Sequence, residues 1–262
     1  MSPLSSLRAT LTQIYPPKPA FTEAQVPPGS QRGRVFIVTG GNAGIGFELS
    51  KILYAAGATV YIASRSKEKV EAAIESIKST TLTPTTSGQL KFLHLDLNDL
   101  RIVKAAAESF ASQESKLDVL WNNAGTGANG RPCRDGSPPN GIDFSVLDTG
   151  VPNKPMVNYG ASKAGKWFLS CAFARRYKAD GITASFEGTP AVAMWIMNRV
   201  MLSEPVFGAY TELFAGLSND VKIEDTGAYI IPWGRIRKEK ATPRHDLIRA
   251  GRTLEEGGLG VW

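Results

Sequence analysis

Two different spacings of apolar residues alternate along the first half of the chain. Short runs rich in apolar residues occur at positions 35–38, 58–63, 90–95 and 117–121, the last three interrupted by one or two polar residues. Between these runs, apolar residues recur every three or four positions, as at Ile45, Leu49 and Ile52. The runs are typical of strands buried on both faces, and the wider spacing is typical of amphipathic helices. Their alternation predicts parallel βαβ units, with helices on both faces of one sheet.

The alternation stops after Gly125. The stretch 126–158 is dense in Gly and Pro and has no apolar set at helical spacing, and only 142–147 could form a short strand. A parallel sheet needs a crossover of about a dozen or more residues, usually a helix, before its next strand. We therefore expect an α/β, three-layer, Rossmann-type, doubly wound parallel sheet with an incomplete strand-five region. Further along, the apolar spacing predicts a helix at 159–177, a strand at 182–186, helices at 192–202 and 210–217, and a strand at 228–231.

The composition fits one globular domain with an extension at each end. Of the 262 residues, 42% are hydrophobic and 21% charged, which excludes a disordered chain and a disulfide-stapled mini-protein. Prolines predict an extended lead-in over 1–33, so the ordered domain covers 34–234. Residues 235–252, within the remaining basic tail 235–262, account for +5 of the net charge of +6. No nucleic-acid-binding motif accompanies this tail, so we expect a solvated extension and no nucleic-acid partner.

The cysteines and the hydropathy indicate a cytoplasmic protein. Cys133 and Cys171 are too few for a disulfide framework and have no partners at metal-ligand spacing, so we expect no metal site. No stretch approaches the roughly 18 apolar residues of a membrane span. The first residues also lack the continuous apolar run of a secretory signal.

A glycine-rich turn follows the first predicted strand. Thr39, Gly40, Gly44 and Gly46 form the pattern TGxxxGxG within TGGNAGIG, at a junction from strand to helix. The missing side chains let the backbone approach a pyrophosphate, and the helix N-terminus supplies N–H donors and partial positive charge. Because the turn lies inside a βαβ unit, it indicates a dinucleotide site.

The end of the second predicted strand indicates which dinucleotide binds. An NAD site usually offers Asp or Glu to the ribose hydroxyls about twenty residues beyond the glycines. This chain has Ala63, Ser64 and Arg65 there. A guanidinium can bind the extra phosphate of NADP through charge-assisted hydrogen bonds, so NADP(H) is favoured over NAD(H). The alternative is that Arg65 is an ordinary surface residue.

Tyr159 and Lys163 are four residues apart at the start of a predicted helix, and so share one face. An ammonium one helical turn from a phenol favours the phenolate form and makes the pair a usable proton donor. A YxxxK pair alone is usually structural. The other motifs of the chain are what favour a catalytic role for this pair.

Four motifs together resemble the short-chain dehydrogenase/reductase family. They are TGGNAGIG at 39–46, Asp96 in LDL, NNAG at 122–125 and YGASK at 159–163. The resemblance covers roughly 34–234, and 188–234 is most similar to the retinol-dehydrogenase-like and WW-domain-oxidoreductase-like branch.

The resemblance implies a role for each matched residue. The cofactor-binding set would be Thr39, Gly40, Asn42, Gly44, Ile45, Gly46, Arg65, Asp96, Asn123, Tyr159 and Lys163. Within it, Arg65 would meet the ribose phosphate, Asp96 the adenine and Asn123 the adenosine ribose. Tyr159 would be the catalytic acid/base. Lys163 would bind the nicotinamide ribose and activate Tyr159.

The chain also departs from the family pattern. The family's catalytic Ser has no secure counterpart, since Ser137 and Ser145 both fit poorly, and SFEGTPAVAM replaces a Pro-Gly turn. About thirty residues, a helix and strand five, are missing relative to the family. Either the protein is a degenerate member, or the sequence comes from an incorrectly spliced gene model. In both cases we expect a weakened homodimer that melts below about 55 °C, because strand four loses a neighbour.

The leading hypothesis is an NADP(H)-dependent oxidoreductase that interconverts an alcohol and a carbonyl in a specialised metabolic pathway. Five apolar residues lie where the family's substrate-covering helices lie, and the resemblance implies a lipophilic small-molecule substrate: Met194, Trp195, Met197, Met201 and Phe207. From the residues alone, ordinary helix packing is the favoured interpretation of this set, and a lipophilic pocket is the alternative. The rival hypothesis is a catalytically impaired NADP-binding relative, a sensor or an inert protein.

Overall fold

The computed structural model describes residues 16–81, 88–125, 142–143, 145, 149–150, 155–187 and 204–237. These residues divide into two compact units. The first, here called the sheet unit, consists of Ala20–Thr126 and Glu204–Gly216. The second unit holds the described residues of Gly127–Ser203 and Leu217–Trp262, together with those before Ala20.

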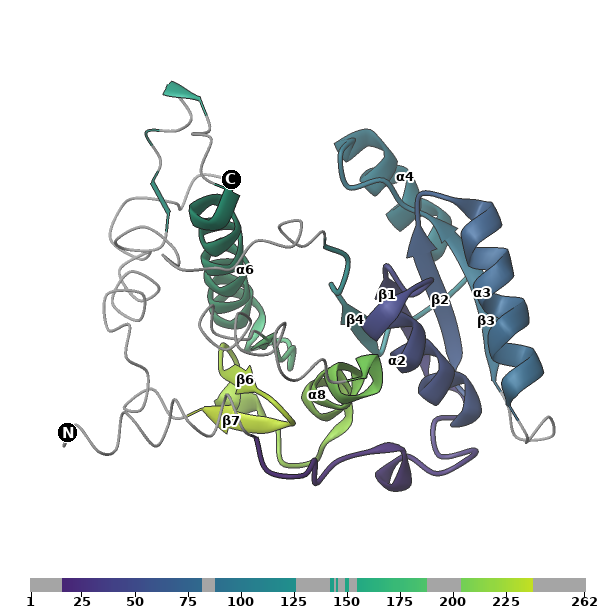
Figure 1. Ribbon diagram of the computed structural model, residues 1–262. Coiled ribbons are helices and arrows are strands. Elements are labelled where there is room, and N and C mark those ends of the chain that lie inside the picture. The colour runs from purple at the N-terminus through teal and green to yellow at the C-terminus, as the bar shows by residue number, and fades with distance from the viewer. Residues whose placement is uncertain are drawn as a thin grey trace. The chain divides into compact units, whose positions relative to one another are not determined.

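The sheet unit is built on four parallel strands in the order β3-β2-β1-β4 (Figure 1). Their bounds are β1 (Val35–Thr39), β2 (Thr59–Ser64), β3 (Gln89–His94) and β4 (Val119–Trp121). Phe36 of the central strand β1 pairs with Val60 on one side and Val119 on the other. All five residues of β1 are buried, as the continuous apolar run predicts for a strand covered on both faces.

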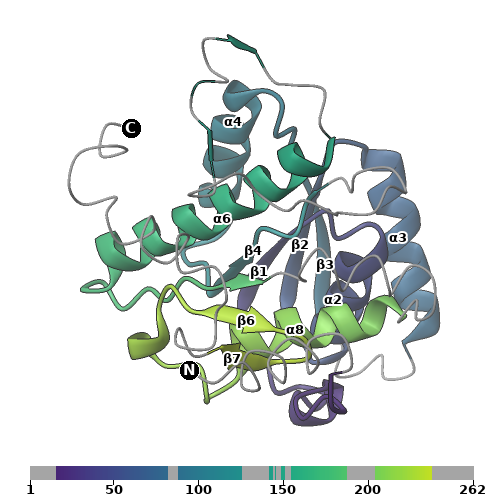
Figure 2. The same cartoon turned by 60° about the vertical axis from the view of Figure 1, so that its left-hand side comes forward.

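Helices cover both faces of this sheet. Their bounds are α2 (Gly44–Ala55), α3 (Lys67–Thr80) and α4 (Leu100–Ala111), and Figure 2 shows α3 beside β3. Adjacent residues of β2 point to opposite faces. Tyr61 packs in a cluster with Phe110 of α4, whereas Ile62 packs in another with Val70 of α3. The predicted three-layer α/β arrangement is therefore confirmed.

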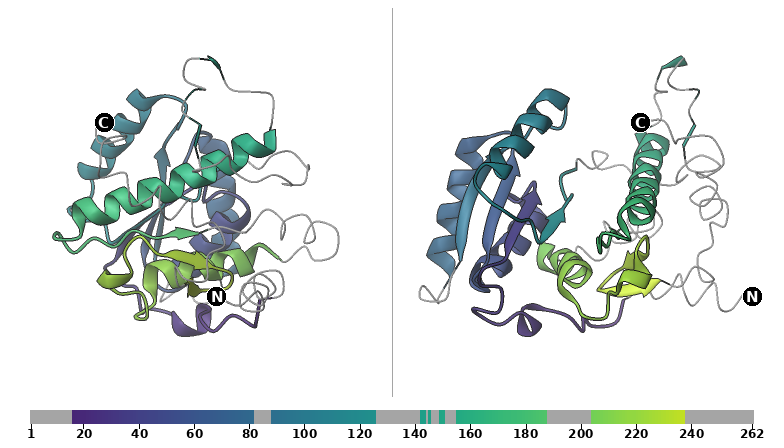
Figure 3. Two further views of the ribbon diagram at one scale, coloured as in Figure 1. Left: turned by 90° about the vertical axis from the view of Figure 1, so that its left-hand side faces the viewer. Right: turned by 180° about the vertical axis from the view of Figure 1, so that it is seen from behind.

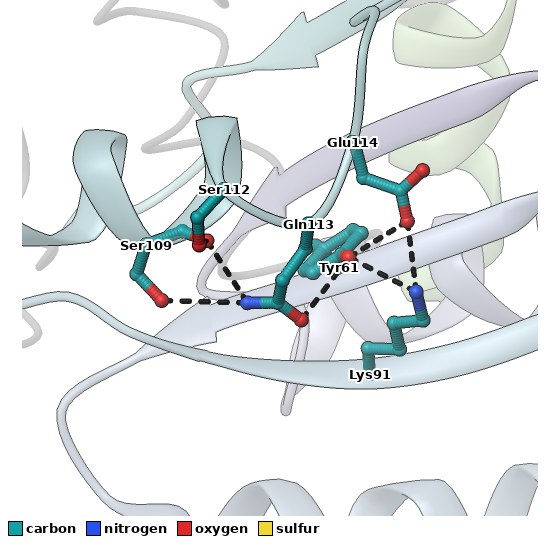
Figure 4. A network of polar contacts seen from close by, with 6 residues as sticks. All are labelled: Tyr61, Lys91, Ser109, Ser112, Gln113 and Glu114. Carbon is teal, nitrogen blue, oxygen red and sulfur yellow. Dashed lines mark hydrogen bonds and ion pairs between the residues drawn. The ribbon is translucent and has the colours of Figure 1, made fainter.

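A polar network ties the end of α4 to the sheet (Figure 4). The Tyr61 hydroxyl donates to Glu114 Oε1 at 2.8 Å, and Lys91 Nζ lies 2.8 Å from the same oxygen. The Tyr61 ring is fully buried and packs edge-on against Phe110 at 5.0 Å. The Tyr61 side chain contacts Phe110 of α4 through its ring and the Lys91–Glu114 ion pair through its hydroxyl. The network therefore fixes the position of the end of α4 relative to β2 and β3.

Two segments distant in sequence complete the sheet unit. One is α8 (Pro205–Leu217), which contains the helix predicted at 210–217. The other is the part of the lead-in from Ala20 onward. It contains the short 3₁₀ helix η1 (Glu23–Gln25), which the expectation of an extended lead-in does not include, and Val26 is only 4% exposed. Phe21 packs edge-on against Phe214 of α8 at 5.9 Å, so the lead-in is part of the packed unit.

The second unit combines a long helix with a small sheet. The helix α6 (Pro155–Tyr177) contains the helix predicted at 159–177. After it come β5 (Phe186–Glu187), η2 (Ile223–Asp225), β6 (Tyr229–Ile231) and β7 (Arg235–Arg237), with the sheet order β5-β6-β7 (Figure 3). Since β6 and β7 are antiparallel, the expected domain boundary after Gly234 falls inside a paired hairpin.

The strand predicted at 182–186 is wrong over most of its length, because only Phe186 belongs to a strand. The backbone of Ala184 explains the difference. Its N–H donates to Thr226 Oγ1 at 3.0 Å, and its carbonyl accepts from Gly227 N. A side chain and a turn satisfy these groups, so they are not part of a strand ladder.

Strand β4 lies at the edge of the described sheet. Within the described residues its one strand partner is β1, and Leu120 is 46% exposed. Ile142, Asp143 and Ser145 of the possible strand 142–147 are not in a strand. The helix predicted at 192–202 lies outside the described residues.

Candidate functional site

The glycine turn joins the end of β1 to the start of α2. Gly40 and Gly44 have positive φ angles of 68° and 57°, and Gly40 N donates to the Ala63 carbonyl at 2.8 Å. A Cβ on Gly46 would lie 2.5 Å from Asn123 Nδ2 and 2.8 Å from the Gly40 carbonyl oxygen. Any larger residue at position 46 would therefore displace the backbone of Gly40 or the side chain of Asn123, which explains why the residue is glycine.

The N-terminus of α2 differs from those of the other two helices that cover the sheet. Ser66 caps α3 by accepting from Lys69 N, and Asp99 caps α4 by accepting from Arg101 N. The N-cap of α2 is Ala43, which makes no such side-chain bond. The first N–H groups of α2 thus remain open to an external acceptor, and the positive end of the helix favours an anion.

The end of β4 supports this turn from one side. Asn123 Nδ2 donates to the Thr39 carbonyl at 2.9 Å. The Thr39 hydroxyl donates to the Trp121 carbonyl at 3.2 Å and accepts from Ala124 N at 2.9 Å. Thr39 was expected to bind the cofactor. Thr39 is 4% exposed and the bonds of its hydroxyl join β1 to β4, while a contact of its backbone with the cofactor stays a prediction.

Ser50 is a supporting residue that the sequence reading missed. Its hydroxyl donates to the Gly46 carbonyl at 2.7 Å inside the buried side of α2. A Cβ on Gly41 would lie 2.7 Å from the same hydroxyl oxygen. The available signal was a polar residue one helical turn after Gly46, on the face where Leu49 and Leu53 are fully buried.

The expected adenosine ligands follow the neighbouring strands. Arg65 comes directly after β2 and is exposed, and Asp96 is half-buried two residues after β3. Asp96 Oδ1 accepts from the backbone N and side-chain amide of Asn98, at 3.0 and 2.9 Å. Since the strands are parallel, their ends place Arg65, Asp96, Asn123 and the glycine turn on one edge of the sheet. Nucleotides bind at this edge in open α/β sheets.

The start of α3 adds charges next to Arg65. Lys67, Glu68 and Lys69 are all exposed. A hydrogen bond from its own backbone N–H, followed by one from the Ser66 hydroxyl, lowers the pKa of the Glu68 carboxyl. Glu68 is therefore anionic at neutral pH, and the cations of this turn outnumber it.

Tyr159 and Lys163 lie on α6 in the second unit, whereas the other expected ligands lie in the sheet unit. Both positions lie within this one helix, four residues apart. Ser145, one candidate for the catalytic Ser, is exposed and its hydroxyl donates to Asp143 Oδ1 at 2.6 Å. That bond lowers the pKa of Asp143. Ser137 lies outside the described residues.

The described part of the chain holds no metal-ligand cluster and no membrane-spanning helix. No group of three or more His, Cys, Asp or Glu residues there could hold a metal ion. None of the helices described is both long and apolar enough to cross a membrane.

Comparison with known proteins supports the family resemblance. The family model for short chain dehydrogenase matches residues 34–143. A short-chain dehydrogenase/reductase of Pestalotiopsis fici is 39% identical, over 95% of this chain and 94% of that protein. This chain belongs to the short-chain dehydrogenase/reductase family. A member from Phomopsis amygdali is 33% identical, over 98% of the chain and 94% of its own length. Membership of the retinol-dehydrogenase-like branch stays a prediction.

The alignment with the Pestalotiopsis fici member also tests whether this chain lacks internal residues that its relatives have. The alignment with the Pestalotiopsis fici member runs over 308 positions, whereas this chain has 262 residues. That relative therefore carries internal residues that have no counterpart here. This agrees with internal deletions relative to the short-chain dehydrogenase/reductase family.

Solved structures share the fold at lower identity. The L-sorbose reductase of Gluconobacter frateurii, complexed with NADPH and L-sorbose, matches 78% of the chain with a TM-score of 0.55 and 16% identity. A 3-oxoacyl-[acyl-carrier protein] reductase of Brucella melitensis with bound NAD matches 79% with a TM-score of 0.55 and 16% identity. These likenesses establish the Rossmann-type fold of this short-chain dehydrogenase/reductase.

Proposed function

We propose that this protein is an NADP(H)-dependent oxidoreductase that interconverts an alcohol and a carbonyl group on a lipophilic small molecule. The observation that carries the proposal is the exposed Arg65 directly after β2, on the sheet edge that also bears the open N-terminus of α2. Ser64 and Ser66 flank Arg65 and offer no carboxylate to the ribose hydroxyls. A guanidinium instead suits the extra phosphate of NADP.

The fold by itself accepts either dinucleotide, since its solved relatives include complexes with NADPH and with NAD. Residues at the end of β2 must therefore make the choice. Lys67 and Lys69 add positive charge near Arg65, and Glu68 opposes them. The surplus of cations favours a phosphate there over a hydroxyl.

The parts of the site fit a dinucleotide. Gly46 leaves room beside the Gly40 carbonyl, and the first N–H groups of α2 would hold the pyrophosphate. Asp96 and Arg65 would hold the two ends of the adenosine moiety. When bound, the nicotinamide supplies or accepts the hydride of the reaction.

Tyr159 and Lys163 would carry the proton chemistry. In the reducing direction Tyr159 gives its phenolic proton to the substrate oxygen, and in the oxidising direction it takes that proton back. Lys163, one turn along α6, keeps the phenol ready to ionise. General acid catalysis of this kind contributes about 10²- to 10⁴-fold in rate.

The rival function, a nucleotide-binding protein with impaired catalysis, is favoured by one observation. The hydroxyl of Ser145 is engaged with Asp143, so within the described residues it is a weak substitute for the family's catalytic Ser. Loss of such an oxygen-polarising donor costs about 10²- to 10³-fold in rate. We therefore expect the enzyme to have weak activity. We also propose that it is cytoplasmic and acts in a specialised pathway.

The deciding experiment measures NADPH oxidation with a panel of lipophilic ketones and aldehydes. Wild type should turn over at least one of them, and Tyr159→Phe should be at least about 100-fold slower. Tyr177→Phe, at the far end of α6, is the matched control and should keep the wild-type rate. Equal rates for wild type and Tyr159→Phe would remove Tyr159 from the mechanism. NADPH binding without any turnover would favour the rival function.

A further inference from the structure

The C-terminal half of helix α8 packs against the rest of the sheet unit. Trp121 Nε1 donates to the Glu212 carbonyl at 2.8 Å, and Gly216 lies so close to the Trp121 indole that a Cβ would overlap it. Phe214 meets Phe21 of the lead-in edge-on. Trp121 itself is 6% exposed and stacks edge-on against Phe36 of β1. This half of α8 is therefore held by the core of the sheet.

The N-terminal half of α8 is also packed against the sheet unit, through the side chain of Tyr210. Tyr210 is 8% exposed. Burial, followed by a hydrogen bond to the Glu23 carboxylate of η1, raises the pKa of the Tyr210 phenol far above its ordinary value. The phenol therefore stays protonated in its buried position beside the Glu23 carboxylate. With anchors at Tyr210 and Trp121, α8 has little freedom to shift along or away from the sheet unit.

Between these anchors and the start of α8, Gly208 contacts the dinucleotide turn. A Cβ on Gly208 would lie 2.5 Å from Ile45 Cδ1 and 2.7 Å from Ile45 Cγ1. Ile45 is the second residue of α2 and is 40% exposed. The backbone of α8 thus sets the position of the side chain that borders the open N–H groups of α2.

We propose that Gly208 is a positioning residue for the cofactor. Its missing side chain lets Ile45 lie against α8 and leaves the first turn of α2 open to the pyrophosphate. Because α8 is anchored and the end of an Ile side chain is flexible, a larger residue at 208 displaces Ile45 toward solvent, over these N–H groups. This inference rests on the proposed dinucleotide function and adds α8, far along the chain, to that site.

The experiment uses the full-length chain with Gly208→Ala, Ile45→Ala and the double variant, and titrates each with NADPH. Gly208→Ala should raise the Kd for NADPH about tenfold while the melting temperature is unchanged or higher, since Ala favours a helix over Gly. In turnover, KM for NADPH should rise while kcat stays close to wild type. A purely structural role would instead lower the melting temperature and leave KM unchanged.

The double variant separates positioning from other causes. Ile45→Ala removes the atoms that a Cβ at 208 would meet, so the double variant should bind NADPH as well as Ile45→Ala alone. Wild-type affinity in Gly208→Ala, or a double variant as weak as Gly208→Ala, would overturn the inference. If wild type binds neither NADPH nor NADH, the proposed function fails, and the inference fails with it.

Discussion

The side-chain amide of Asn123 donates a hydrogen bond of 2.9 Å to the backbone carbonyl of Thr39, which joins the ends of two parallel strands. Thr39 is the last residue of β1, and Asn123 follows β4 by two residues. The same amide nitrogen lies close to Gly46, on the inner side of the glycine turn. Asn123 thus supports the turn from the protein side and leaves its outer side open.

Asn123→Ala should therefore weaken NADPH binding about five- to tenfold, because a hydrogen bond of this kind contributes about 1 kcal/mol. The measurement is a fluorescence titration with NADPH. Asn122→Ala, at the adjacent exposed position, is the matched control and should bind nearly as wild type does. An equal loss in both variants would mean that the Thr39 contact is not the cause.

Ser50→Ala should lower the free energy of unfolding by about 1 to 2 kcal/mol, since the Gly46 carbonyl loses a buried hydrogen bond. Urea denaturation measures this loss. The control is Ser76→Ala on the exposed side of α3, which should change stability by less than about 0.5 kcal/mol. If the two variants are equally stable, Ser50 does not hold the turn.

Arg65→Ala should raise the Kd for NADPH by about 10- to 100-fold, the effect of removing a charge-assisted bond to phosphate. The Kd for NADH should change by less than about threefold, because NADH lacks that phosphate. Lys78→Ala removes a cation from the last turn of the same helix α3 and serves as the control for net charge. Parallel losses for both dinucleotides would contradict the assignment of Arg65.

The Tyr61, Lys91 and Glu114 network makes part of the stability depend on pH. A hydrogen bond from Lys91, followed by one from Tyr61, lowers the pKa of Glu114 below its ordinary value of 4.5. A lowered carboxyl pKa in the folded state contributes stability above the unfolded pKa, and this stability is lost as pH falls through the folded value. Acid should therefore weaken the attachment of α4.

Glu114→Gln should accordingly lower the free energy of unfolding by about 1 kcal/mol at pH 7, a modest value because Lys91 is partly exposed. The gap between wild type and variant should shrink below about pH 4.5. Urea denaturation at pH 7, 5 and 3.5 measures this. A gap that stays constant over that range would show that the charge of Glu114 is not involved.

Much of the sheet unit could be predicted from the sequence because its signals are local. Short runs rich in apolar residues predicted all four parallel strands to within one or two residues at each end, and helical spacing predicted α2, α3 and α4. The glycines of 40–46 predicted a strand-to-helix turn, since a close backbone approach and a positive φ are properties of the residues themselves. The family could likewise be recognised from short motifs.

Tertiary structure alone decided how these parts support one another. Ala184 reads as part of a strand, yet a turn 42 residues later satisfies its backbone, and sequence spacing carries no information about that partner. Thr39 reads as a cofactor ligand, but the approach of β4 uses its hydroxyl internally. Gly208 lies against Ile45 because contacts with Trp121 and Phe21 hold α8 on the sheet unit. Contacts between residues so far apart depend on how the whole chain packs, and local patterns of hydrophobicity do not encode that packing.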